Sequence, residues 1–150
     1  MAYDLSSPHI GPHTTYFEAP DIIFLRIVGS VDLEDGLEIN RRHPEFAKGR
    51  DAIYFLVDLS GLEKIHPAVR KRATEVLNEV PLKGMVGFGA STKAKVIATL
   101  IFTALNLFSG KAEKIPLEFT KTEAQAREWI EKRRQELKAA KAAAGGKNGR

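Results

Sequence analysis

The sequence predicts an α/β sandwich with a mostly parallel sheet, an antiparallel opening strand and four helices. Short β-rich runs alternate along the chain with longer amphipathic stretches, in the order β-β-α-β-α-β-α-β-α. One of these runs, residues 53–57, is apolar at every position and lies between two aspartates. A run of this kind is typical of a central strand that is buried on both faces, as in parallel sheets.

The sheet is expected to open with two short strands, residues 14–19 and 22–28, which Pro20 separates. The residues before them, 1–13, mix Ser, Pro, Gly and His without apolar periodicity. We therefore expect a flexible leader there.

Asp32 has the character of a cap for a weakly amphipathic helix, which we expect to be interrupted near Pro44. The buried strand at residues 53–57 follows, and Ser60 and Gly61 predict a turn directly after it.

The second half of the chain continues the alternation. Pro67 suits the first turn of a helix whose apolar positions recur with helical spacing as far as Val80. Residues 83–89 predict a short strand, and Ser91 is a suitable cap for a helix that runs to Phe108.

Leu117 and Phe119 suggest a last short strand. Thr120 and Glu123 then have the spacing of a capping box for a final helix that extends through Leu137. The chain is therefore interpreted as one domain with a short tail.

The charges support this division into a leader at 1–13, a domain at 14–137 and a flexible basic tail at 138–150. Residues 1–120 hold 14 Lys and Arg against 15 Asp and Glu, whereas residues 121–150 hold 9 against 4. The globular part is nearly neutral and shows no basic stripe, so nucleic-acid binding is not expected.

Composition excludes several classes of protein. There is no Cys and there are only four His among 150 residues, so we expect no disulfide, no metal site and no cofactor. No nucleophile stands in a recognisable catalytic motif, and we expect no enzymatic activity. The start of the chain does not resemble a secretory signal, and the uncharged apolar stretch at 96–108 is too short for a membrane span. We expect a cytoplasmic protein.

The stretch Asp58-Leu59-Ser60-Gly61 resembles the central segment of STAS domains, the fold of bacterial anti-sigma-factor antagonists. The two opening strands, the glycine-flanked strand at 83–89 and a final helix with Trp129 fall in the order that family uses. The resemblance covers about residues 14–133. Within it, the SpoIIAA-like and SEC14-like small bacterial proteins are the closer match, because an Arg follows the turn as Arg70 does here.

The resemblance implies a non-enzymatic, regulatory protein–protein interaction module whose partner is an anti-sigma factor or a kinase-like protein. In the antagonists a Ser that follows an Asp at the start of the second helix is phosphorylated; these positions fall on Pro67 and His66 here. Proline cannot accept a phosphoryl group, so the usual switch is missing. The expected partner surface comprises Asp58, Ser60, His66, Pro67 and Arg70.

Two further sites follow from the residues themselves. Ser91, Thr92 and Lys93 begin a helix after a glycine-containing strand, and they either cap that turn or bind an anion.

The helix at 92–108 is apolar nearly all round, so something besides one sheet face must cover it. Ile97, Ile101, Leu105 and Phe108 are expected to pack in the protein's own core, to form a homodimer face, or to contact an apolar, lipid-like ligand. The last possibility gives an alternative function, that of a small carrier or sensor of such a ligand.

Overall fold

The structure is a computed structural model that describes residues 3–110 and 113–148. Its strands are β1 (His9–Ile10), β2 (His13–Glu18), β3 (Ile22–Val31), β4 (Ile53–Ile65), β5 (Leu82–Phe88) and β6 (Leu117–Thr120). Its helices are α1 (Leu33–Ala47), α2 (Pro67–Glu79), α3 (Thr92–Phe108) and α4 (Glu123–Asn148). The expected order of elements is confirmed, with the short strand β1 added before it.

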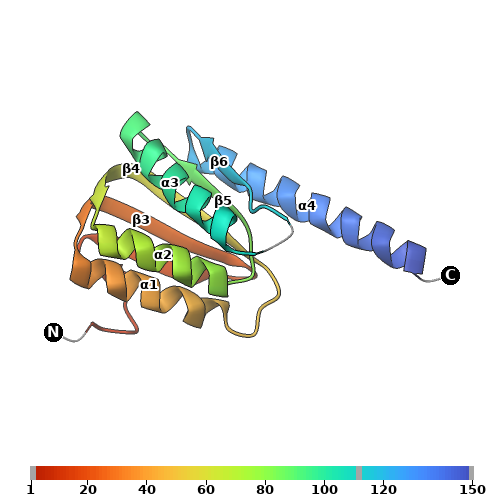
Figure 1. Ribbon diagram of the computed structural model, residues 1–150, viewed down its shortest axis with the longest axis horizontal. Coiled ribbons are helices and arrows are strands. Elements are labelled where there is room, and N and C mark those ends of the chain that lie inside the picture. Colours follow the sequence, from red (N-terminus) through yellow and green to blue (C-terminus); the bar gives the residue numbers. More distant parts are fainter. Residues whose placement is uncertain (1–2, 111–112, 149–150) are drawn as a thin grey trace.

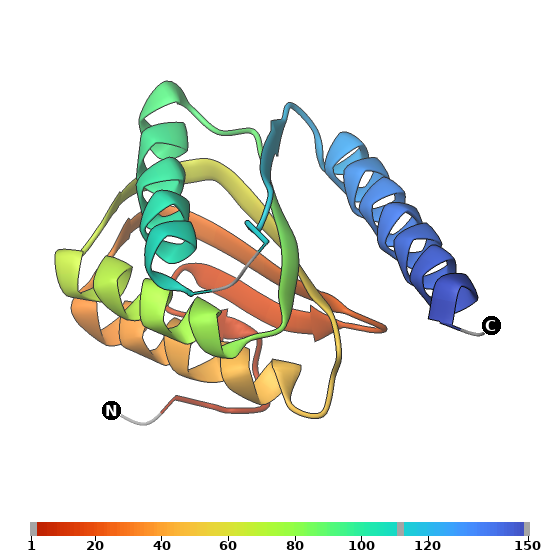
Figure 2. The same ribbon diagram turned by 45° about the vertical axis from the view of Figure 1, so that its right-hand side comes forward.

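The six strands lie in one sheet in the order of the sequence, β1-β2-β3-β4-β5-β6. The first three strands are antiparallel to one another, and β3 to β6 are parallel. Each parallel pair is connected through a helix, as parallel strands require. Helices α1, α2 and α3 cover one face of the sheet, while α4 lies on the other and projects beyond the body (Figures 1 and 2).

Strand β4 separates two hydrophobic cores, because its side chains alternate between the two faces of the sheet. Phe55 and Val57 belong to the larger core under α1, α2 and α3. Tyr54 and Leu56 belong to a smaller core under α4, where they meet Ile130. The prediction of a strand buried on both faces at residues 53–57 is therefore confirmed, since each of its residues is at most 3% exposed.

The turn expected at Ser60 and Gly61 is not present. Strand β4 continues to Ile65 and stays paired with β3 along this length, through two irregularities in register. Hydrogen bonds to β3 keep the chain extended here. Because β3 is distant in the sequence, the local residues do not reveal this pairing. A side chain at Gly61 would lie 3.0 Å from the carbonyl oxygen of Ile27, so the close approach of the strands favours glycine there.

Helix α1 is not interrupted near Pro44 as expected. Pro44 lies in its last turn, where the missing N–H removes a single helical hydrogen bond and the helix still reaches Ala47. The expected cap is confirmed, because the side chain of Asp32 accepts a hydrogen bond from the N–H of Asp35.

Both ends of the chain are more regular than expected. His9 and Ile10 pair with β2, so the sheet begins before Thr14, inside the segment we expected to be a loose leader. Helix α4 stays helical through Asn148, although its residues 138–145 are exposed. Within the described residues no helix combines the length and the hydropathy that a membrane crossing needs.

Replacement of Ile130 by Ala should lower the free energy of unfolding by about 2 to 4 kcal/mol, because this fully buried side chain joins α4 to the sheet. Removal of residues 138–150 should change it by less than about 0.5 kcal/mol, since the described side chains there are exposed. Urea denaturation measures both. A large loss of stability in the truncated chain would show that the projecting end of α4 supports the fold.

Candidate functional site

The five residues expected to form one partner surface lie in two separate places. Asp58 and Ser60 belong to β4, and the alternation of that strand directs the side chain of Asp58 toward the α4 face of the sheet. His66, Pro67 and Arg70 begin α2, which covers the opposite face. Eight residues of extended chain, roughly 25 Å, separate Asp58 from His66. The structure therefore does not bring these residues together.

Asp58 is fully engaged within the sheet. Its Oδ2 accepts a hydrogen bond from Nε of Arg26 at 2.9 Å, and its Oδ1 accepts from the N–H and the hydroxyl of Ser60 at 3.0 and 2.7 Å. Partial burial acts to raise the pKa of Asp58, but the hydrogen bonds from Arg26 and Ser60 outweigh it and hold the pKa below its ordinary value. This carboxylate clamps β3 to β4 and is poorly suited to act as a base.

At the start of α2, one side chain caps the helix and an arginine lies half-buried beside it. Nδ1 of His66 accepts a hydrogen bond from the N–H of Ala68 at 3.1 Å, so His66 is the N-cap, and Pro67 follows in the first turn. Arg70 is half-buried, and its Nε has no hydrogen-bond partner among the described residues. This Nε atom is itself buried, so it is not open to a partner from outside.

The start of α3 is similarly basic. The hydroxyl of Ser91 accepts a hydrogen bond from the N–H of Ala94 at 3.1 Å, which confirms its predicted role as the cap. Thr92 and Lys93 are exposed, and the ammonium group of Lys95 lies 5.9 Å from the ring centre of Phe119. No acidic residue stands in the first turn of either α2 or α3. The binding of an anion by Ser91, Thr92 and Lys93 stays a prediction.

The two faces of α3 have different surroundings. Ile97, Ile101 and Leu105 point inward and pack against the larger core. Phe108 is 76% exposed at the end of the helix. The other large apolar side chains that face solvent are Val96, Leu100 and Leu107, at 54%, 54% and 66% exposure. Three of the four residues expected to form a ligand or dimer face are thus inside, and the open apolar face lies on different residues.

A cavity of about 90 Å³ lies between the sheet and the three helices that cover it. Its lining is apolar except for two buried polar residues of α1, Asn40 and His43. An apolar cavity of this size destabilises a fold by about 2 kcal/mol, at roughly 24 cal/mol per Å³. Sites for drug-sized ligands measure about 300 to 1,000 Å³, so a lipid-like molecule would require α2 and α3 to move apart.

The hydrogen bonds around His43 fix its tautomer. The hydroxyl of Thr15 donates to the carbonyl oxygen of Phe24 at 2.8 Å and lies 3.1 Å from Nε2 of His43. Because a hydroxyl has a single hydrogen, Nε2 of His43 must carry a proton and donate it to Thr15. Nδ1 is then the unprotonated nitrogen. Burial lowers the pKa of His43 to about 3, so the ring is neutral at physiological pH.

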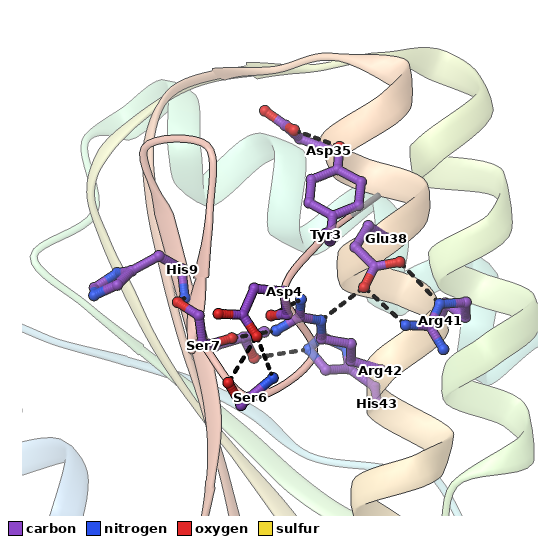
Figure 3. A network of polar contacts seen from close by, with 11 residues as sticks. Tyr3, Asp4, Ser6, Ser7, His9, Asp35, Glu38, Arg41, Arg42 and His43 are labelled. Atoms are coloured by element: carbon purple, nitrogen blue, oxygen red, sulfur yellow. Dashed lines mark hydrogen bonds and ion pairs between the residues drawn. The ribbon is translucent and has the colours of Figure 1, made fainter. Parts of the chain in front are cut away.

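A second polar group, on the outer side of α1, holds the beginning of the chain (Figure 3). The guanidinium group of Arg42 donates to the carbonyl oxygens of Ser7 and Asp4 at 2.6 and 3.2 Å. The hydroxyl of Tyr3 donates to Asp35 at 2.7 Å. These contacts explain why the residues before Thr14 are ordered on the helix.

Glu38 completes this group and orients Arg42. Its carboxylate accepts hydrogen bonds from Arg41 and from Nε of Arg42, all at 2.8 Å. The hydrogen bonds from Arg41, supported by those from Arg42, lower the pKa of Glu38 to about 2 against the effect of burial. The group therefore remains an ion pair at physiological pH, and we assign it a structural role.

Sequence reasoning missed Asn40, Arg42 and His43 as buried residues. We treated His43 as an interruption of a helix, because a lone His beside a Pro carries no signal of burial. The only local signal was the spacing of four residues between Glu38 and Arg42, which suits an ion pair on one helix face and so indicates a partner for Arg42. No group of three or more His, Cys, Asp or Glu in the part of the chain that the structure describes is arranged to hold a metal ion.

The mixed sheet, with three helices on one face and one on the other, has a SpoIIAA-like fold. The crystal structure of an uncharacterized protein of the DUF3478 family with a SpoIIAA-like fold, from Shewanella loihica PV-4, matches with a TM-score of 0.56 and 16% identity. The match covers 86% of this chain and 98% of that chain, and at this identity it shows the fold alone. A scan against protein-family models and a search of the curated proteins give no match.

Acidification should destabilise the protein through His43. In the unfolded chain a histidine takes up a proton near pH 6.5, whereas His43 in the fold does so only near pH 3. Stability is therefore complete above about pH 6.5 and falls as the pH decreases toward 3. Between pH 6.5 and 5 the loss due to His43 should be about 2 kcal/mol, at about 1.4 kcal/mol per pH unit.

The measurement is the free energy of unfolding of the wild type and of His43→Asn across this pH range, with the exposed His9→Asn as control. His13 contributes with the same sign in all three proteins, since burial also lowers its pKa. A pH dependence in His43→Asn as steep as in the wild type would contradict the assignment.

Proposed function

We propose that the protein is a non-enzymatic, STAS-like regulatory module that binds a partner protein through the outer face of α3 and the N-terminal ends of α2 and α3. The observation that supports this proposal is the exposed apolar surface of α3. Single exposed apolar residues are ordinary, but Val96, Leu100 and Leu107 follow one another along one side of a single helix. We call this row, with Thr103 between the two leucines, the α3 ridge.

The spacing of the α3 ridge fits another helix. Its positions 96, 100, 103 and 107 are separated by four, three and four residues, which is the repeat that packs helices side by side. No charged residue occurs in the sequence from Val96 to Gly110 that would oppose such a contact. An amphipathic helix that lays its apolar face on a groove or ridge is a common mode of peptide recognition.

Basic side chains at the N-terminal ends of α3 and α2 favour an acidic partner. Lys93 and Lys95 lie in the first turn of α3, and Arg70 and Lys71 lie near the start of α2. The helix dipoles add further positive potential at these N-termini. An acidic segment on the partner would meet these groups.

Other features support regulation without the usual switch. Pro67 stands where the STAS resemblance expects the phosphorylated serine, so control by phosphorylation at that position is absent. Asp58 and Ser60, on the other face of the sheet, are engaged with Arg26 and with each other and are not part of the proposed surface. The partner that the resemblance favours is an anti-sigma factor or a kinase-like protein in the cytoplasm of a bacterium.

The test compares the wild type with Leu100→Glu and with Leu37→Glu, all produced with an affinity tag in the protein's own cells. Leu37 is an exposed leucine of α1 with 42% exposure, so its substitution adds the same charge away from the α3 ridge. Native mass spectrometry should find a stoichiometric partner on the wild type and on Leu37→Glu. The amount of partner bound to Leu100→Glu should be at least about tenfold lower, as expected when a central apolar contact is removed.

Arg70→Glu should weaken the same complex, because it removes the positive charge that faces the acidic end of the partner. Retention of the partner by Leu100→Glu would show that the docking surface lies elsewhere. If the only complex is a dimer of this chain that Leu100→Glu dissolves, the α3 ridge is a homodimer face and the proposed hetero-partner is wrong. Sedimentation of the purified protein distinguishes these results.

A further inference from the structure

We propose that the cavity beneath α2 and α3 is a binding site for a small, uncharged, largely apolar molecule that carries one hydroxyl or N–H donor. This site goes beyond the docking function and does not depend on it. It lies on the inner side of α3, opposite the α3 ridge. Its two polar residues, Asn40 and His43, both come from α1.

The cavity is poorly suited to water. A buried water molecule makes about three hydrogen bonds and needs partners on several sides. Here the polar groups lie together on one helix, and the other walls are formed by apolar side chains such as Phe55, Val57 and Ile101. Apolar cavities of this kind remain dry and accept apolar molecules instead.

The polar groups of the cavity offer acceptors. Nε2 of His43 donates to Thr15, which leaves Nδ1 as an acceptor with no donor among the described residues. The side-chain amide of Asn40 uses its NH₂ group on the carbonyl oxygen of Val69 at 3.2 Å, which leaves its oxygen as an acceptor. A ligand that supplies one donor would satisfy one of these atoms, whereas a ligand with acceptors alone would satisfy neither.

The size and surroundings of the cavity define the rest of the ligand. A cavity of about 150 Å³ accepts benzene, so a cavity of about 90 Å³ suits a slightly smaller molecule. A charged ligand would be buried without a counter-ion, because no Asp, Glu, Lys or Arg lines the walls.

The route of entry is the seam between α2 and α3. Ala73 of α2 and Ile97 and Ile101 of α3 line the cavity, yet all three are only partly buried. Leu25 and Ile65 also line the cavity and are partly buried, but they belong to the sheet, whereas the seam lies between two helices that can move. A small outward displacement of either helix would admit a molecule of this size.

Pyrrole and furan provide a matched pair of probes, because the two rings have nearly the same shape and only pyrrole carries an N–H donor. The full-length protein is titrated with each, and the methyl signals of Ile97 and Ile101 are followed by NMR, with those of exposed Leu37 as a control. We expect saturable shifts at the cavity residues and about tenfold tighter binding of pyrrole than of furan, as one added hydrogen bond gives.

Four variants make the test specific. His43→Phe combined with Asn40→Leu removes both acceptors, so pyrrole and furan should then bind within about twofold of each other. Ala98→Leu fills the cavity from α3 and should abolish binding of both probes, and Ala73→Leu does the same from α2 should the first variant not fold. Leu100→Glu, which disrupts the α3 ridge, should bind pyrrole as the wild type does.

The proposal is overturned if neither probe gives saturable shifts in the wild type, since the cavity then does not bind ligands of this class. It is also overturned if furan binds as tightly as pyrrole, or if the variant that lacks both acceptors keeps the preference for pyrrole. None of these results bears on partner binding at the α3 ridge. That proposal is tested separately, by native mass spectrometry of Leu100→Glu.

Discussion

Burial of β4 on both faces is the constraint on which the rest of the structure depends. Every side chain from Ile53 to Val57 is removed from solvent, and each such side chain contributes about 1.5 to 3 kcal/mol when it is buried. One sheet face alone cannot provide this burial. The chain therefore has to supply helices on both sides, and α4 crosses to the far face to cover Tyr54 and Leu56. The three-layer arrangement follows from this strand.

The extension of β4 past Asp58 has a second consequence. Its last residues outrun β5, which ends at Phe88 opposite Asp58, and they pair only with β3. The Arg26 to Asp58 ion pair holds the two strands together where the register changes, and the hydrogen bond from Ser60 within β4 orients the Asp58 carboxylate. The extension carries the chain far from Asp58 before α2 begins. For this reason the two halves of the expected partner surface are on opposite sides of the sheet.

The sequence predicted well those features that depend on local patterns. The central strand, the caps Asp32 and Ser91 and the order of elements follow from alternation, spacing and side-chain chemistry within a few residues. The extent of β4 was missed because Asp-Leu-Ser-Gly is a favourable turn sequence, and only pairing with β3 makes it extended. Order near the N-terminus was missed for the same reason, since Arg42 is 35 positions away from Ser7.

The candidate site was predicted only in outline. The sequence showed that α3 is too apolar to be covered by one sheet face, and this is confirmed by the exposure of Val96, Leu100 and Leu107. It did not show the rotation of the helix about its axis. A helix that is apolar on all sides carries no amphipathic signal to set that rotation, so the sequence could not decide whether Ile97 and Ile101 pack in the core, as they do, or face outward. The cavity could not be predicted either, because its volume depends on how side chains of different helices and strands pack together.

The two faces of the sheet also differ in how firmly their helices are attached. On one face, α4 is fastened by ion pairs to other elements, from Arg127 to Glu18 and from Arg134 to Asp21. On the other face, no ion pair among the described residues joins α2 to α3, and the one formed on α2, between Arg72 and Glu75, stays within that helix.

Helices α2 and α3 are therefore held to each other by apolar contacts, and a cavity lies beneath them. Apolar contacts weaken steeply as the atoms separate. Regions held in this way open at lower free energy than the rest of a fold, and binding sites are drawn from them. One helix, α3, thus presents an unfilled space on its inner side and an uncovered apolar ridge on its outer side. A molecule bound on either side would act on the same weakly attached element, so both proposed binding events concern α3 rather than the clamped strands around Asp58.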